Sequence, residues 1–203
     1  MENTNKPLVY LATPYSYKHE DKAVKDAKEI ERFERANKIG AMLTKEGYTI
    51  FSPISMAHPM NQYGLPGNWE FWAKFDEAFI SCCYKMFVIC ADGWLESVGV
   101  KAELKLAKKY NIPVTFLDAE GNPLDTIVKL THTTEDGRWE TSEKVRIHIE
   151  DLLDTDDGRY LLKTLFHGDN KFAQLIKSPT SRGLKTPTES SSGVVHLGAD
   201  DDK

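Results

Sequence analysis

Apolar residues over roughly the first 120 positions form short continuous runs that alternate with stretches of helical spacing. Four runs predict strands, at residues 8–12, 48–52, 86–91 and 112–117, and the run 86–91 is typical of a strand buried on both faces. Three stretches repeat apolar side chains every three or four positions and predict amphipathic helices: residues 20–46, the residues after the potential N-cap Asn68, and residues 98–110. This alternation predicts an α/β fold in which helices cover a parallel sheet.

The residues that follow each predicted strand are the first candidates for a ligand site. Ligands of parallel sheets bind at the carboxyl ends of the strands, which here are residues 13–16, 52–58 and 92–99. Residues 53–67 contain three prolines and two glycines, which predicts a long loop. Long loops in compact domains are commonly functional, so this segment is expected to border the site.

The pattern changes after Asp118. Two strand-like stretches, residues 126–133 and 138–149, flank Glu135-Asp136-Gly137 and predict a β-hairpin. A weaker helical pattern covers residues 158–176, and the Ser/Thr/Pro/Gly-rich sequence from Lys177 onward predicts a disordered tail. The chain is therefore divided into a main domain of residues 1–118, a small α+β appendage of residues 119–176, and a tail of residues 177–203.

The composition of the chain argues against two classes of binding partner, nucleic acids and membranes. The net charge of −5 lacks the basic excess of a general nucleic-acid binder. No apolar run approaches the roughly 18 residues that cross a bilayer, so no membrane partner is expected. Because the first residues lack a charged segment followed by a long apolar one, a secretory signal is not expected and a cytoplasmic location is predicted.

Three cysteines crowd around one apolar stretch, at Cys82, Cys83 and Cys90. Their odd number does not suit a disulfide framework, and their spacing lacks the ligand pairs and histidines of a zinc site. We expect small buried residues there, and no metal. The lysines of the predicted helix that ends at Tyr110 form a basic face, which is usually a solvated surface.

The segment from Ser97 to Ala107 carries the most informative polar residues. If a helix begins near Val98 or Gly99, Glu103 lies next to the apolar stripe that faces the sheet. The free N–H groups at such a helix start favour negative charge and hold a phosphate, here with the Ser97 hydroxyl and with close backbone approach at Gly99. From spacing alone, an ordinary acid in the early turns of a helix is the favoured interpretation of Glu103.

Four blocks of polar and turn-forming residues follow one another along residues 8–118. They are Tyr10-Leu-Ala-Thr-Pro-Tyr-Ser16, Lys45-Glu-Gly-Tyr-Thr-Ile-Phe-Ser-Pro53, Asp76 on the next helix, and Ser97 to Glu103. In their order and spacing these blocks resemble the nucleoside 2-deoxyribosyltransferase family, and in particular its branch of nucleoside 5′-monophosphate N-glycosidases.

The resemblance implies a flavodoxin-like (Rossmann-like) three-layer catalytic domain that uses no cofactor. Glu103 would attack or stabilise the anomeric carbon of the sugar, Asp76 would hydrogen-bond or protonate the departing base, and Tyr10 would orient Glu103. This fits glycosidic chemistry, because a nearby carboxylate neutralises or traps an oxocarbenium-like sugar. Without the resemblance, an exposed helix acid is an equally open interpretation of Asp76. A strand tyrosine packed in the core is the competing interpretation of Tyr10.

The resemblance also bears on the substrate. A serine six residues before the glutamate, here Ser97, resembles the branch that cleaves monophosphates, so a nucleotide substrate is expected. Thr13, Tyr15 and Ser16 would complete the phosphate pocket, although Thr13 stands where family members commonly have glycine.

Two further residues are candidates from their positions in predicted loops. His58 lies where a base would be stacked or recognised, or it is an ordinary solvated histidine. Asp92 would accept a hydrogen bond from a sugar hydroxyl, or it is simply an acid at a turn.

Three functions remain in competition. The first is hydrolysis of a (deoxy)ribonucleoside 5′-monophosphate to free base and sugar 5-phosphate. The second is base exchange by a nucleoside 2-deoxyribosyltransferase. The third is non-catalytic binding, as a nucleotide sensor that signals through the appendage or as a structural phosphate-binding domain. The resemblance further implies a homodimer or a larger homo-oligomer, and Trp69 and Trp72 are expected in the core or in a dimer contact.

Overall fold

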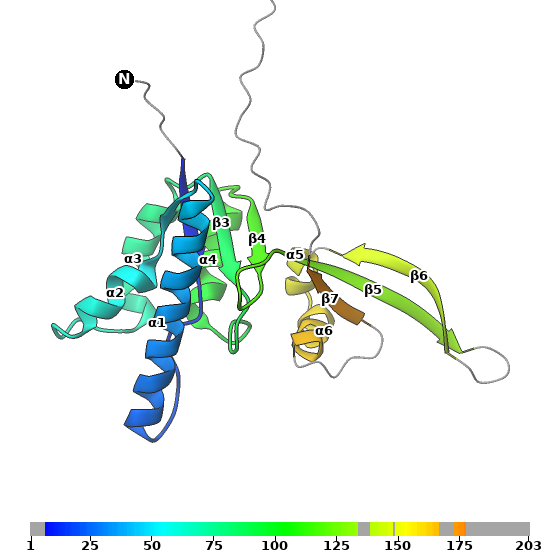
Figure 1. Ribbon diagram of the computed structural model, residues 1–203, viewed down its shortest axis with the longest axis horizontal. Coiled ribbons are helices and arrows are strands. Elements are labelled where there is room, and N and C mark those ends of the chain that lie inside the picture. The colour runs from blue at the N-terminus through cyan, green and yellow to red at the C-terminus, as the bar shows by residue number, and fades with distance from the viewer. Residues whose placement is uncertain (1–6, 134–138, 148, 167–172, 178–203) are drawn as a thin grey trace, which may run out of the picture.

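A four-stranded parallel sheet forms the centre of the computed structural model, which describes residues 7–133, 139–147, 149–166 and 173–177 (Figure 1). Its strands are β1 (Leu8–Ala12), β2 (Thr49–Phe51), β3 (Lys85–Ile89) and β4 (Val114–Leu117), in the order β2-β1-β3-β4. In the register, Tyr10 lies opposite Phe51 on one side and Met86 on the other. The parallel α/β fold predicted from the apolar pattern is confirmed.

Helices cover both faces of this sheet. The helices of the domain are α1 (Lys22–Lys45), α2 (Pro53–Asn61), α3 (Trp69–Ile80) and α4 (Val98–Lys109). Alternate residues of β1 point to opposite faces: Val9 and Leu11 pack in one cluster with Ile39 and Leu43 of α1. Tyr10 and Ala12 pack in a second cluster with residues of α3 and α4. The three-layer, Rossmann-like arrangement follows from this division of the core.

The predicted loop at residues 53–67 is wrong over its first half, because α2 occupies Pro53–Asn61. Ser52 is the N-cap, and its side chain accepts a hydrogen bond from the backbone N–H of Ser55 at 3.3 Å. Pro53 follows at the first helical position, where its fixed φ favours a helix and its missing N–H costs nothing. At the start of α3, Asn68 occupies the predicted N-cap position, but its side chain makes no capping hydrogen bond.

The appendage contains a hairpin and two short helices. Strands β5 (Leu124–Thr133) and β6 (Trp139–Ile147) pair antiparallel, as predicted, and project away from the central sheet (Figure 1). Helices α5 (Ile149–Leu153) and α6 (Asp156–Phe166) follow. The turn at Glu135-Asp136-Gly137 and the tail from residue 178 lie outside the described residues.

The predicted helix over residues 158–176 is confirmed as far as Phe166 and wrong at residues 173–176, while residues 167–172 lie outside the described residues. Residues Ala173–Lys177 form β7, which pairs antiparallel with β5 and so gives the backbone of β5 a second partner. The sequence Gly168-Asp169-Asn170, rich in turn formers, separates the helical pattern from this strand. Because Lys177 belongs to β7, the predicted tail also begins one residue too early.

The appendage shares the core of the main domain. Ile149 of α5 and Leu162 of α6 are 4% and 0% exposed, and both belong to the cluster that contains Val100 and Ala107 of α4. The two short helices therefore pack over α4 and β4. Within the described residues, no helix is both long enough and apolar enough to cross a bilayer.

The cysteines are all free thiols. Cys83 and Cys90 are buried as expected, and burial raises the pKa of the Cys83 thiol to about 12. The prediction that Cys82 is buried is wrong: it is exposed, because it lies in the turn that follows α3.

Two isoleucines of α1 test how much the helix–sheet contact contributes to stability. Ile39 is 1% exposed, whereas Ile30 on the same helix is 46% exposed. We expect Ile39→Ala to lower the free energy of unfolding by about 2–4 kcal/mol, because it leaves a cavity against the sheet. The control Ile30→Ala should change it by less than about 1 kcal/mol. Urea unfolding followed by circular dichroism measures both, and equal effects would contradict the packing described for α1.

Candidate functional site

A tyrosine of β1 and a glutamate of α4 meet inside the protein. The Tyr10 hydroxyl donates a hydrogen bond of 2.8 Å to Oε1 of Glu103, and the two side chains are 0% and 5% exposed. The register of β1 turns Tyr10 toward the face that α4 covers. The start of α4 at Val98, with Ser97 as N-cap, places Glu103 in the second turn of the helix. The structure thus brings together two residues that are 93 positions apart in the sequence.

Asp76 of α3 is the third member of this group. It is 5% exposed, and its charge acts on both Glu103 and Tyr10. Oε2 of Glu103 and Oδ1 of Asp76 are buried, and neither atom has a hydrogen-bond partner among the described residues. The interpretation of Asp76 as an exposed helix acid is wrong. Each carboxyl group therefore retains one buried oxygen whose hydrogen-bonding capacity is unused by the fold.

Burial shifts the titration of both acids. Burial, with a further contribution from the charge of Asp76, raises the pKa of Glu103 to about 8, although the Tyr10 hydrogen bond opposes the shift. Burial also raises the pKa of Asp76 to about 6, again opposed by Tyr10. Two interacting acids of this kind titrate as a pair. Near neutral pH the pair holds about one proton, so it offers one carboxylate and one carboxylic acid side by side.

The helix that carries Glu103 begins at Val98, with Ser97 as its N-cap. The Ser97 hydroxyl oxygen accepts a hydrogen bond of 3.3 Å from the backbone N–H of Val100. A Cβ atom built on Gly99 would lie 3.9 Å from Ser97 and from Trp69, which is ordinary van der Waals contact. The surrounding protein therefore does not require glycine at position 99, and the close approach of a ligand remains its predicted role.

The first loop and α2 form a second group of polar residues. The Tyr15 hydroxyl and Nδ1 of His58 share a hydrogen bond of 2.8 Å, and the His58 ring stacks on Phe33 with 4.2 Å between centroids. Thr13 is 5% exposed, and its Oγ1 has no hydrogen-bond partner in the described part of the chain. His58 is thus half-buried and ordered by two contacts, rather than a solvated loop histidine.

Arg32 is a functional candidate that the sequence reasoning missed. It is 3% exposed on α1, and its guanidinium donates to the carbonyl oxygens of Tyr15 at 3.1 Å, Ser16 at 2.8 Å and Asp92 at 2.9 Å. These carbonyls belong to the loops after β1 and β3, so one side chain joins both strand ends. The available signal was an arginine in line with the apolar positions Ala36 and Ile39.

Asp92 is not brought to the carboxyl pair. Its side chain is 63% exposed and lies 3.7 Å from Nζ of Lys28 and 3.8 Å from Nη2 of Arg32. Both cations belong to α1, which packs on the face of the sheet opposite Tyr10. Ser16 is exposed, and the bond that its carbonyl accepts from Arg32 fixes its backbone. Among the described residues, no group of three or more His, Cys, Asp or Glu side chains is placed to hold a metal ion.

The raised pKa of Glu103 predicts how the free energy of unfolding changes with pH. The native protein keeps the proton on Glu103 between its ordinary pKa of 4.5 and about 8, while the unfolded chain releases it. Raising the pH through this range therefore destabilises the native protein. In Glu103→Gln this loss is absent, so the variant should gain about 2–4 kcal/mol relative to the wild type between pH 5 and pH 8.5.

Chemical unfolding at several pH values measures this difference. Glu70→Gln is the control, because Glu70 is an exposed acid on α3. Its difference from the wild type should stay constant with pH. A flat difference for Glu103→Gln as well would contradict the burial of an ionisable group at position 103.

Comparison with known protein families gives a match to the part of the chain that contains this site. A family model described as a domain of unknown function, DUF1937, matches residues 7–119. No curated protein matches the chain. The matched range contains Tyr10, Asp76, Glu103 and Arg32, and it ends before β5, the first strand of the appendage.

Proposed function

The chain belongs to the DUF1937 family, and we propose that it is a hydrolase that cleaves the N-glycosidic bond of a nucleoside 5′-monophosphate. One observation carries the proposal: Tyr10 holds Oε1 of the buried Glu103, while Oε2 has no partner among the described residues and lies in the field of Asp76. A fixed carboxyl group with one free oxygen, next to a second carboxyl group, is the arrangement used in glycoside hydrolysis with retention.

The first step forms a covalent bond to Glu103. Its Oε2 attacks C1 of the sugar as the C1–N bond breaks, and the electron pair of that bond stays on the base nitrogen. Asp76, in its protonated form, gives its proton to the departing base. The products are the free base and a glycosyl ester of Glu103. Water then attacks C1, Asp76 takes up the proton, and Glu103 is released as a carboxylate with sugar 5-phosphate as the second product.

The reaction depends on which carboxyl group of the pair carries the shared proton. The reactive form carries its proton on Asp76 and leaves Glu103 ionised. The empty site favours the proton on Glu103, whose pKa is the higher of the two. Positive charge that develops at C1 favours the ionised glutamate, and so does the hydrogen bond from Tyr10. Substrate binding therefore moves the proton toward the arrangement that the chemistry needs.

The start of α4 supports a 5′-phosphate on the substrate. The free N–H groups of a helix N-terminus bind anions. Because the Ser97 oxygen accepts the capping bond, its hydroxyl proton is left to donate to a phosphate oxygen. The buried Thr13 hydroxyl, which has no partner among the described residues, is a further donor. Together with the resemblance of Ser97 to the monophosphate-cleaving branch, these groups favour a nucleotide over a free nucleoside.

Release of free base tests the proposal directly. A panel of purine and pyrimidine nucleoside and deoxynucleoside monophosphates, modified ones included, is incubated with the protein and separated by chromatography. We expect base release from at least one nucleotide, and a loss of about 10³-fold or more in Glu103→Gln. The control Glu70→Gln should retain the wild-type rate.

The same assay separates the competing functions. Addition of a second base gives a new nucleotide if the protein exchanges bases, and only sugar phosphate if it hydrolyses. A sensor would bind nucleotides and release no base, and in that case the hydrolase proposal fails. The expected homo-oligomer is measured separately by analytical ultracentrifugation.

The carboxyl pair predicts a bell-shaped dependence of kcat/KM on pH. Activity should rise as the pair loses its first proton near pH 6 and fall as it loses the second near pH 8, because only the singly protonated pair reacts. In Tyr10→Phe both limbs should move to higher pH, since the hydroxyl lowers both pKa values. Tyr63→Phe, at a residue that is 87% exposed, is the control and should leave the profile unchanged. Limbs that do not move in Tyr10→Phe would contradict the role given to Tyr10.

A further inference from the structure

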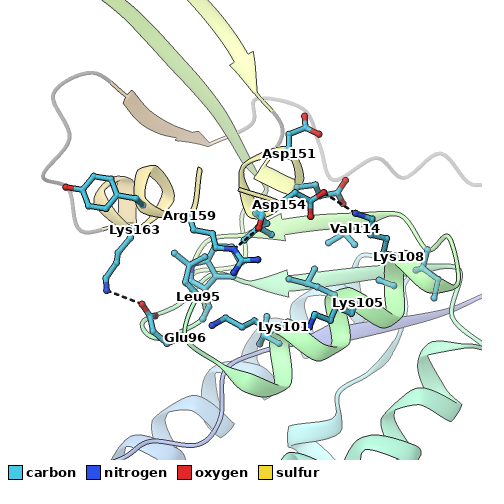
Figure 2. Close-up of a pocket in the computed structure, with 18 of the residues that line it drawn as sticks. Leu95, Glu96, Lys101, Lys105, Lys108, Val114, Asp151, Asp154, Arg159 and Lys163 are labelled. Atoms are coloured by element: carbon cyan, nitrogen blue, oxygen red, sulfur yellow. Dashed lines mark hydrogen bonds and ion pairs between the residues drawn. The ribbon is translucent and has the colours of Figure 1, made fainter. Parts of the chain in front are cut away.

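A cavity of about 690 Å³ lies between α4 and the two short helices of the appendage (Figure 2). Its volume falls within the range of sites that bind small organic molecules. Tyr10, Asp76 and Glu103 do not line it. It is therefore separate from the carboxyl pair, although α4 contributes residues to both.

The floor of the cavity is apolar. It is formed by the loop before α4, by α4 itself and by the region of β4, through Leu95, Val100, Leu104, Ile112 and Val114. Val100 and Ile112 are buried core residues, so they hold the floor in a fixed shape. Tyr160 of α6 adds an aromatic ring that is 72% exposed. This lining suits the apolar body of a ligand.

Three cations at the cavity form no ion pair with a described residue. Lys101 and Lys105, one turn apart on α4, form no hydrogen bond or ion pair with another described residue. Figure 2 shows both side chains below the guanidinium of Arg159. Arg159 donates from Nε to the carbonyl oxygen of Leu153 at 2.7 Å, which orients the group and leaves its two terminal nitrogens free to bind an anion.

The acidic residues around the cavity do not neutralise these cations. Asp154 pairs with Lys108 at 3.0 Å, and Glu96 pairs with Lys163 at 3.5 Å. The carboxylate of Asp151 points away from Lys101 and Lys105 in Figure 2. Glu150 also lines the cavity and has an interaction of its own. The local charge at the centre of the cavity is therefore positive.

From this combination we propose that the cavity binds a small organic anion, with a carboxylate or phosphate head at Lys101, Lys105 and Arg159 and an apolar body on Leu95 and Leu104. The basic face that the sequence marks as a solvated surface is then one wall of a ligand site. Because Leu104 follows Glu103 on α4, the ligand contacts the helix that carries the proposed nucleophile. The inference does not depend on the reaction that Glu103 performs.

A fluorescent probe with this chemistry tests the site. Anilinonaphthalene sulfonate carries an anionic head on an aromatic body and becomes fluorescent in apolar surroundings. We expect saturable binding of one probe per chain, displaced by decanoate or by decyl phosphate. Inorganic phosphate alone should displace it far less, because it cannot use the apolar floor. The relative strength of the two decyl compounds distinguishes a carboxylate head from a phosphate head.

Charge reversal locates the binding. The double variant Lys101→Glu/Lys105→Glu should bind the probe about tenfold more weakly or worse, since it replaces attraction of the head group by repulsion. The control Lys38→Glu/Lys45→Glu makes the same change in net charge at exposed positions of α1 and should bind as the wild type does. Hydrogen exchange with and without decanoate should show protection in α4 and α6.

Three results would overturn the proposal. The first is the absence of saturable probe binding to the folded wild type, and the second is equal binding by the two double variants. The third is a self-associated wild type that Lys101→Glu/Lys105→Glu splits into monomers, because the cavity would then be covered by a second copy. None of these results bears on base release, which tests the hydrolase separately.

Discussion

The fold buries the carboxyl group of Glu103, and the hydrogen bond from Tyr10 is what stabilises this group inside the protein. Glu103 lies among apolar residues of α4 and the sheet, with Asp76 as its acidic neighbour and with no cation among its electrostatic partners in the described part of the chain. Such burial is unfavourable unless the group stays protonated or is hydrogen-bonded. The Tyr10 hydroxyl satisfies one oxygen, and the proton shared with Asp76 limits the remaining charge. The register of β1, the N-cap of α4 and the packing of α3 together hold this contact in place.

The two faces of the sheet contribute differently. The face toward α1 holds an apolar cluster and is linked to the strand ends by Arg32. The opposite face contains the buried acids within an otherwise apolar cluster. The purely apolar packing and the buried carboxyl pair therefore lie on the two sides of one strand, because successive residues of β1 alternate between them. This division lets a destabilising pair of acids exist in a small domain.

The sequence predicted the parallel sheet because its strands are continuous apolar runs and its helices are strongly periodic. It failed at residues 53–61, where a proline at the first helical position looked like a loop former, and at β7, whose conformation depends on pairing with the distant β5. The expectation that Tyr10 orients Glu103 required the resemblance, since spacing alone favoured an ordinary helix acid. Arg32 was missed because a buried arginine is defined by the loop carbonyls that it binds, and these lie far away in the sequence.

The family match ends at residue 119, but the hydrophobic core of the domain continues into the appendage. Leu162 and Ile149 cover the outer side of α4 and β4, and both are almost completely buried there. A chain shortened to the matched range would expose this apolar surface to water, and exposed patches of this kind promote aggregation. The appendage thus covers an apolar surface of the matched domain, so related chains that lack it are expected to carry polar residues on the outer face of α4.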